Sequence, residues 1–320
     1  MLFEPSQIGP LLQRLADDHS LYLGTSSWKF PGWCGVLYDE DDYLWGKHFS
    51  KARFKRDCLT RYSEVFRSVC VDSTYYHLPR KGEFEKLVDQ VPEGFRFTFK
   101  VPDQITIKNF PKVKSFGDRA GQANEFFLDP RLFRMGFLRP LERIRDYVGM
   151  LVFEFSHFHT ADFEHGRDFV RALDRFLGEL PEDWNYGVEV RNANFLHDEY
   201  FEVLGRRGIA HIYNQWTLMP SVTEQIGIHP LVRNPFLAAR FLLTPHCSRD
   251  WAEREFAPYN QLKEIDQAAR DSLRQMIDHT VASSGGGAAY LYVGNMLEGN
   301  ALHTLSDALK DLGSGHLSNR

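Results

Sequence analysis

The stretch "MLVFEFSHFHTADFEHGRDFVRALDRFLGELPEDWNYGVEVR" (residues 150–191) contains one complete unit of strand, helix and strand. Runs of mainly apolar residues at 150–156 and 186–191 predict two short buried strands. Between them, residues 166–180 place apolar side chains three and four positions apart, which is the spacing of an amphipathic helix. Two strands joined by such a helix are parallel, and the connection between them is right-handed.

The same alternation of strand and helix continues in both directions along the chain. Further strands are predicted at 21–25, 68–74, 95–101, 209–214, 239–244 and 288–295. Helical patterns fall at 84–91, 131–149, 198–208, 260–281 and 301–313. Residues 215–230, which follow the sixth strand, make a poor helix, so we expect an irregular loop there.

Eight strands that alternate with helices are the number found in a TIM-type barrel. An open doubly wound sheet would normally carry a glycine-rich phosphate loop, but the sequence contains neither GxGxxG nor a P-loop motif. We therefore predict an α/β fold, a TIM-like (β/α)8 barrel that forms a single domain over residues 1–320. The barrel is expected at about residues 21–313, with a long first βα loop that caps the mouth and with flexible termini.

The composition is that of a globular protein without crosslinks. Hydrophobic residues make up 43% of the 320 positions, which is enough for a large core. The net charge of −5, with both signs interspersed, argues against general binding to nucleic acid or membranes. The four cysteines form no CxxC pair, and we find no signal-peptide pattern and no apolar run long enough to span a membrane. We expect a cytoplasmic protein; the sequence specifies neither a cofactor nor an oligomeric state.

Polar residues gather at the predicted strand ends, where TIM barrels carry their sites. Glu189 and Arg191 lie two positions apart and therefore share one face of their strand. The other strand ends supply Lys100, Glu154, Arg240, Asp72, Ser73, Thr74, Asn214 and Asn295. We expect these side chains to line one shared pocket.

The residue types indicate a small anionic ligand, related to a sugar or a nucleotide. Lys100, Arg191 and Arg240 would bind its phosphate or carboxylate, and Glu189 and Glu154 are candidates for proton transfer. Trp28, Trp33, Tyr75 and Tyr76 would form the pocket walls. The competing explanation is structural: a belt of ion pairs closes the barrel top. In it, Glu189 pairs with Arg191 or Lys100, and Asp72 pairs with Arg240. Whether the protein is an enzyme stays open at this point.

Two other classes of function have weaker support. Asp72, Glu154, His157, His159 and Glu189 are ligand types for a divalent metal, as in a metal-dependent hydrolase, isomerase or nuclease, although the HExxH motif is absent.

A non-catalytic protein that binds a partner or nucleic acid is the third class. The basic run at 47–61, with Trp45 and Phe54 to stack on bases, favours it. The acidic net charge and the neighbouring "DEDD" (39–42) argue against it.

Five segments, in order, resemble those of the YecE-like family, known as domain of unknown function 72. They are "LYLGTSSWKFPGWCGVLY" (21–38), "RYSEVFRSVCVDSTYYHLP" (61–79), "FRFTFKVPDQIT" (95–106), "YGVEVRNANF" (186–195) and "LYVGNMLEGNAL" (291–302). The resemblance extends from residue 21 to about 310 and implies a TIM-like barrel, but no established activity. Glu154 stands where the family has glutamine, Ser156 and His157 where it has prolines, and Asn214 where it often has aspartate. The chain therefore resembles a divergent member.

Overall fold

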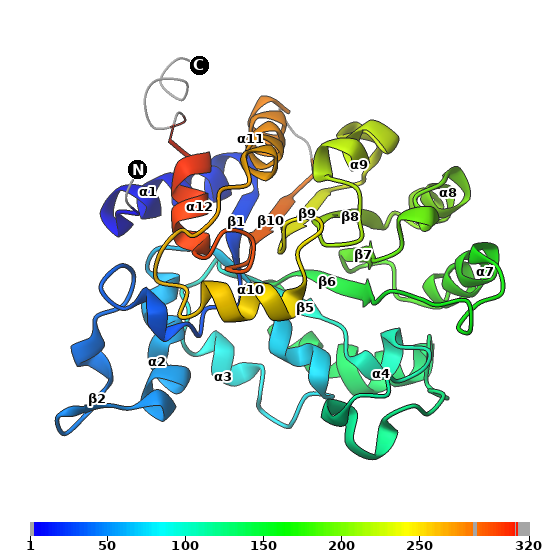
Figure 1. Cartoon of the computed structure of the whole chain (residues 1–320), viewed down its shortest axis with the longest axis horizontal. Helices are drawn as coiled ribbons and strands as arrows, with labels where there is room; N and C mark the ends of the chain where they lie inside the picture. Colours follow the sequence, from blue (N-terminus) through cyan, green and yellow to red (C-terminus); the bar gives the residue numbers. More distant parts are fainter. Residues whose placement is uncertain (1–2, 284–286, 311, 313–320) are drawn as a thin grey trace.

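The computed structural model describes residues 3–283, 287–310 and 312, and its main strands close into a barrel (Figure 1). All neighbouring strands in the barrel are parallel, in the order β1-β10-β9-β8-β7-β6-β5-β4, and β4 pairs back onto β1. The strands are β1 (Leu21–Ser26), β4 (Ser68–Val71), β5 (Arg96–Lys100), β6 (Val148–Phe155), β7 (Tyr186–Val190), β8 (Ala210–Gln215), β9 (Leu237–Phe241) and β10 (Ala289–Val293). Each lies within a few residues of its predicted range, so the predicted TIM-like barrel is confirmed.

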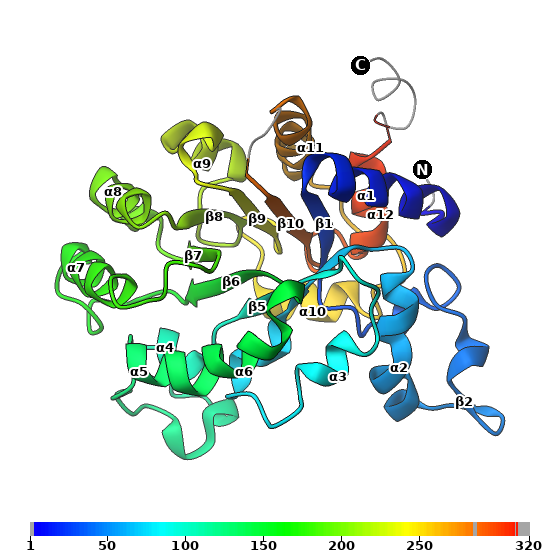
Figure 2. The ribbon, with the colours of Figure 1, turned by 180° about the vertical axis from the view of Figure 1, so that it is seen from behind.

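Helices surround the barrel, as Figures 1 and 2 show from opposite sides. They are α2 (Lys51–Ser63), α3 (Glu85–Val88), α4 (Asp103–Thr106), α5 (Pro130–Leu132), α6 (Arg139–Leu141), α7 (Gly166–Leu177), α8 (Asp198–Arg206), α9 (Val222–Ile228), α10 (Arg249–Phe256), α11 (Gln267–Ala282) and α12 (Ala301–Ala308). The helix predicted at 131–149 is an irregular helical region that begins with α5 and includes a π-helical turn, Phe133–Leu138. Within the described ranges, every helix is too short or too polar to cross a bilayer.

Two segments that the sequence pattern left without structure are helical. The chain before β1 forms α1 (Pro5–His19), which buries one apolar stripe against β1 and α11 (Figure 2). The prediction of a flexible N-terminal segment is therefore wrong for these residues, because Ile8, Leu11 and Leu15 recur at helical spacing. Residues 1–2 and 313–320, also predicted to be flexible, lie outside the described residues.

The irregular loop predicted at 215–230 contains the short helix α9. A capping box explains it: the Ser221 side chain accepts from the backbone N–H of Glu224, and the Glu224 carboxylate accepts from the backbone N–H of Ser221. These hydrogen bonds satisfy two donors that the helix start would otherwise leave free, so a segment with weak apolar periodicity still forms a helix.

The long first βα loop is confirmed, but most of it does not cap the mouth. It includes a small hairpin, β2 (Leu44–Trp45) and β3 (His48–Phe49), at the periphery of the molecule (Figure 1). Trp33 anchors the loop from within, because it is fully buried and its ring packs against those of Phe30 and Tyr38. Only Ser27 and Phe30 of this loop reach the cavity described below.

The barrel interior explains how the strands position polar side chains at the mouth. Inside the barrel lies an apolar cluster that includes Met150, Val152 and Ile212. Because side chains on a strand alternate between its two faces, Glu154 is the next inward position after Val152, and Asn214 is the next after Ile212. The mouth is therefore the last inward-facing layer of the barrel, polar where the layers beneath it are mainly apolar.

Candidate functional site

Arg240 on β9 lies at the centre of the barrel mouth and binds three carboxylates from three other strands. Its Nη1 atom donates to Glu154 on β6 (2.9 Å) and to Glu189 on β7 (2.7 Å). Its Nη2 atom donates to Asp72, which follows β4 (2.7 Å). Only 1% of the Arg240 side chain is exposed, so this charge depends on its partners rather than on water.

Two further cations complete the arrangement. Lys100 Nζ on β5 lies 2.9 Å from Glu154 Oε2, and Arg191 Nη2, just after β7, lies 3.2 Å from the same oxygen. Arg191 also forms an ion pair with Glu189. We call Asp72, Lys100, Glu154, Glu189, Arg191 and Arg240 the mouth network. Three cations face three carboxylates in it, so the network as a whole is close to neutral.

Two aromatic rings and an amide hold the cations in place. The Arg191 guanidinium lies 4.1 Å from the centre of the Trp216 ring, and Lys100 Nζ lies 4.0 Å from that of Tyr75. Asn214, fully buried below the mouth, accepts from Arg191 Nη1 at 3.3 Å. Contacts of a cation with a ring face restrict its position while adding attraction, so the charged ends are preorganised.

The network determines which of its groups are ionised. Burial alone would raise the pKa of Glu154, but Lys100, Arg191 and Arg240 outweigh it and hold that pKa well below its usual range. Burial alone would lower the pKa of Lys100, but Glu154 and Asp72 outweigh it and raise that pKa. Burial also raises the pKa of the Tyr75 hydroxyl to about 12. At neutral pH, Glu154 is therefore a carboxylate and Lys100 an ammonium.

The depressed pKa of Glu154 predicts a pH-dependent contribution to stability. A carboxyl with a lower pKa in the folded state stabilises the fold above its unfolded pKa of about 4.3 and loses this effect as the pH falls through the folded value. We expect Glu154→Gln to lower the free energy of unfolding at pH 7, and the gap from wild type to narrow below about pH 4. Urea unfolding of both proteins from pH 7 to below pH 4 would measure this difference in unfolding free energy, with Glu199→Gln at an exposed position as control. A gap independent of pH would contradict the argument.

A cavity of about 510 Å³ lies over the mouth network. Its floor includes Asp72, Lys100, Glu154, Arg191 and Arg240. Its other walls include the rings of Phe30, Tyr75, Tyr76, Phe116, Trp216 and Tyr259. Arg249 and Glu253 of α10, which lies across the front of the barrel in Figure 1, also line it. We call this space the mouth cavity.

Three buried polar atoms of residues around this cavity have no hydrogen-bond partner among the described residues. They are Ser26 Oγ, Asn295 Nδ2 and Arg240 Nε. The residues lie on or next to three neighbouring strands, β1, β10 and β9. The Asn295 amide is oriented by its oxygen, which accepts from the backbone N–H of Ala301 at 2.8 Å, so its nitrogen is left as a donor. A buried donor without a partner costs about 1–3 kcal/mol.

Not all residues predicted for the pocket lie in it. Trp28 and Trp33 were expected as walls, but both are buried in the core and do not line the cavity. Ser73 does not line it, and the Thr74 hydroxyl donates to the backbone carbonyls of Val71 and Lys100 instead. Glu189 and Asn214 were also expected to line the pocket, but both are fully buried and do not line it. The aromatic rings that line the cavity come from neighbouring loops. Two of them, Trp216 and Tyr259, were not identified from the sequence pattern.

Ser26 was also not selected as a site residue. Its only signal in the sequence was a polar side chain at the end of the first strand.

The five residues of the metal-site hypothesis do not form a ligand set. Asp72, Glu154 and Glu189 all bind Arg240. His157 and His159 line a different cavity beside the mouth. Across the described ranges, no group of three or more histidine, cysteine, aspartate or glutamate side chains is placed to hold a metal ion. An arginine at the centre of the carboxylates occupies the position that a cation would take.

The stacking surface proposed for nucleic acid is also not formed as expected. Trp45 is 79% exposed at the tip of the β2–β3 hairpin, but Phe54 is fully buried on the inner face of α2. Phe54 packs edge-on against Tyr38 and Tyr43, so it belongs to the core of the first loop. A single exposed ring is left, which is too little for the predicted stacking of successive bases.

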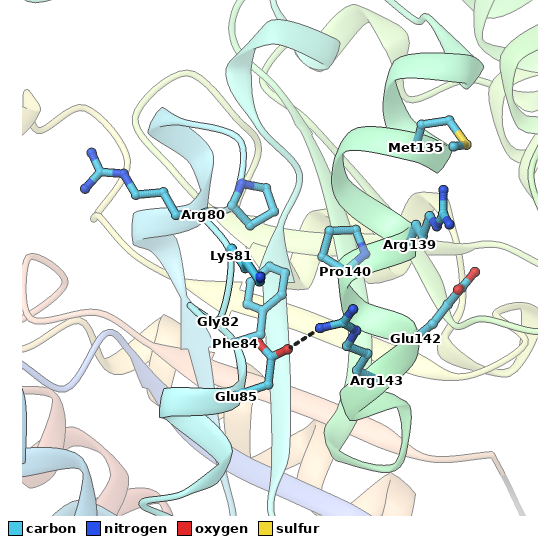
Figure 3. A pocket seen from close by; sticks show the side chains of 11 residues that line it. Arg80, Lys81, Gly82, Phe84, Glu85, Met135, Arg139, Pro140, Glu142 and Arg143 are labelled. Carbon is cyan, nitrogen blue, oxygen red and sulfur yellow. Dashed lines mark hydrogen bonds and ion pairs between the residues drawn. The ribbon is translucent and has the colours of Figure 1, made fainter.

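A second cavity, of about 520 Å³, lies outside the barrel between the loop after β4 and the irregular helical region (Figure 3). Its walls include Arg80, Lys81, Arg139 and Arg143, and Glu85 pairs with Arg143 at 3.4 Å. These charges are largely exposed, and no residue of the mouth network contributes. Exposed ion pairs contribute little, so we consider the mouth the stronger candidate.

Comparison with known proteins places the chain in a family. Residues 22–319 match the family described as "Protein of unknown function DUF72". The UPF0759 protein YecE of Escherichia coli strain K12 is 29% identical over 189 residues, which are 59% of this chain and 55% of that protein. The matched part thus spans little more than half of that relative.

Solved structures show the same fold. A DUF72 family protein from Enterococcus faecalis V583 superposes with a TM-score of 0.61 at 18% identity, covering 94% of this chain and 98% of the other. A DUF72 family protein from Thermotoga maritima MSB8 superposes with a TM-score of 0.59 at 21% identity, covering 91% of this chain and 98% of the other. The predicted YecE-like resemblance is confirmed: the chain belongs to the DUF72 family of proteins of unknown function.

Proposed function

We propose that the mouth cavity binds a small, oxygen-rich anionic ligand such as a sugar phosphate, and that Glu154 can accept a proton from it. The observation that carries the proposal is the set of unpaired donors, Ser26 Oγ, Asn295 Nδ2 and Arg240 Nε, in residues that surround the cavity. These atoms are themselves buried, so a ligand would recover the hydrogen bonds they lack if its binding brings oxygen atoms against them. A purely structural ion-pair belt explains the paired charges but not these donors.

The charged groups of the floor suit hydroxyl groups and an anion together. Carboxylates accept hydrogen bonds from sugar hydroxyls, and Lys100 and Arg191 donate to oxygen atoms. Phe30, Tyr76 and Tyr259 add aromatic surface next to these charges. This combination of a few placed polar groups with aromatic walls is typical of small-molecule sites.

Proton transfer would depend on how the ligand engages Lys100. With its pKa held well below the usual range, Glu154 is ionised at neutral pH and cannot act as an acid. Lys100 does most to lower the pKa of Glu154. A ligand that draws Lys100 away from Glu154 therefore raises the pKa of Glu154. Glu154 would then become a better base once the ligand is bound, which ties proton acceptance to occupancy of the cavity.

Thermal unfolding with a ligand panel tests the proposal. The panel contains ribose 5-phosphate, glucose 6-phosphate, the corresponding free sugars, nucleoside monophosphates and inorganic phosphate. A ligand at about 100 times its dissociation constant adds roughly 2.7 kcal/mol, or about 4 °C for a chain of 320 residues. We expect wild type to show such a shift with a sugar phosphate or a nucleotide, and Lys100→Met to lose most of it.

Two further variants separate binding from stability. Ser26→Ala removes a buried atom without a partner, so we expect an equal or higher midpoint without ligand but a smaller shift with ligand. Lys51→Met, exposed at the start of α2, should behave as wild type. If Ser26→Ala responds to every ligand as wild type does, the unpaired donors have no part in binding and the proposal loses its main support.

A further inference from the structure

A third cavity, of about 570 Å³, adjoins the mouth cavity and shares part of its wall. We call it the lateral cavity. It is lined by residues 106–112 after β5, by Gly121, by residues 156–159 after β6, and by Ala161 and Asp162. Ile107, Pro111 and Ser156 line both cavities. A ligand that extends past these three side chains would occupy both spaces.

The two loops that form the lateral cavity are tied together by Asp162. One of its carboxylate oxygens accepts from the Asn109 side chain at 2.6 Å, and the other from the backbone N–H of His159 at 2.7 Å. Both oxygens are therefore engaged in holding the loops. The cavity has a defined frame on this side, built from hydrogen bonds rather than from an ion pair.

The lysines of the lateral cavity differ from the cations of the mouth. Within the described part of the chain, neither Lys108 nor Lys112 pairs with a carboxylate within 4.0 Å. Lys108 Nζ lies 3.6 Å from the centre of the Phe163 ring, which positions the ammonium without neutralising it. In the mouth, by contrast, Lys100, Arg191 and Arg240 all have carboxylate partners. Unneutralised positive charge is thus found beside the mouth rather than in it.

Two imidazoles add polar contacts to the same wall. His157 Nδ1 lies 3.1 Å from the backbone carbonyl of Arg191, which only accepts, so this nitrogen carries a proton. Nε2 of the exposed His157 ring is then an acceptor in the neutral imidazole, so it suits a ligand hydroxyl and leaves the phosphate oxygens to the lysines. The His159 ring packs edge-on against it, with centres 5.1 Å apart. Arg191, whose guanidinium belongs to the mouth network, therefore also orients the His157 ring through its backbone carbonyl.

We propose that the lateral cavity binds the phosphate group of the ligand, while the sugar part lies in the mouth cavity. This inference rests on the proposed function and adds the position of the anionic group. A phosphate in the mouth would have to compete with Glu154 for Lys100, whereas Lys108 and Lys112 have no such competitor. Hydroxyl groups, which both donate and accept, suit the balanced charges of the mouth.

Isothermal titration with matched sugars tests the inference. The titrants are ribose 5-phosphate against ribose and glucose 6-phosphate against glucose, on wild type, on the double variant Lys108→Ala/Lys112→Ala and on Lys100→Met. We expect wild type to bind one phosphorylated sugar at least tenfold more tightly than the free sugar. The double variant should lose roughly tenfold to a hundredfold in affinity for that phosphate and none for the sugar. Lys100→Met should lower the affinity for both the phosphorylated sugar and the free sugar.

The control is Lys51→Ala/Lys55→Ala, which removes the same charge from the exposed face of α2. If this control variant loses as much affinity for the phosphorylated sugar as Lys108→Ala/Lys112→Ala does, the effect is one of overall charge and the inference is overturned. If a sugar phosphate binds and the Lys108 and Lys112 pair has no effect, the inference fails while the proposed function stands. If no titrant binds wild type, the proposed function fails for sugar phosphates, and the inference fails with it.

Discussion

Arg240→Ala is expected to lower the free energy of unfolding by about 3–5 kcal/mol, which would lower the melting midpoint by roughly 5–7 °C. Arg240 is the common partner of Asp72, Glu154 and Glu189. Glu189 is fully buried, so without the guanidinium it keeps only Arg191 as a described cationic partner. Desolvated carboxylates that lose a counter-charge account for most of the expected cost. Denaturant unfolding at neutral pH measures it.

The control is Arg206→Ala, because Arg206 pairs with Asp174 at an exposed position and should contribute less than about 1 kcal/mol. A double-mutant cycle with Glu189→Ala then isolates the pair from the lost packing of the arginine stem. If Arg240→Ala costs no more than Arg206→Ala, or the cycle shows no coupling, the mouth network does not stabilise the barrel as described.

Stability should also fall as the pH drops below about 6.5, because of His211 on β8. Burial, with a smaller effect of His229, lowers the pKa of His211 from 6.5 to about 3. The folded state therefore keeps the ring neutral while the unfolded chain takes up a proton, so stability is lost from about pH 6.5 down to about pH 3. The shift corresponds to a loss on the order of 4 kcal/mol over that range.

His211→Asn tests this directly. The amide can keep a hydrogen bond to the Tyr200 hydroxyl, which lies 3.1 Å from His211 Nδ1, but it does not titrate. We expect the unfolding free energy of the variant to change less than that of wild type between pH 6.5 and 4.5, by about 2.3 kcal/mol. The exposed His48→Asn is the control and should follow wild type. Parallel pH curves for wild type and His211→Asn would show that His211 does not cause the dependence.

The period of two along the strands explains why much of the mouth could be predicted from the sequence. Once strands are assigned to "MLVFEFS" and "YGVEVR", the faces of Glu154 and Glu189 are determined by alternation alone. Parallel strands in a closed barrel end at the same rim, so residues far apart in sequence, such as Lys100 and Arg240, are expected to meet. The fold and the floor of the cavity follow from local patterns of this kind.

The walls of the mouth cavity could not be predicted in the same way. Trp28 and Trp33 lie in a loop, and no periodicity shows whether a loop ring faces a cavity or the core. The energy of burying Trp33 among Phe30 and Tyr38 decides its position, and that contact depends on the path of the whole loop. Trp216 lines the cavity because Arg191 lies over its ring, a contact between two loops. Positions set by tertiary packing have no local signature.

The connectivity of the mouth network has a consequence for folding kinetics. Arg240 and Asp72 are separated by 168 positions in the chain, yet their side chains bind each other directly. Contacts of such long range form only after the strands between them are in place, because the entropy of closing that loop must be lost first. Interactions absent from the folding transition state slow unfolding without accelerating folding. The mouth network is therefore expected to lengthen the lifetime of the closed barrel more than it speeds its formation.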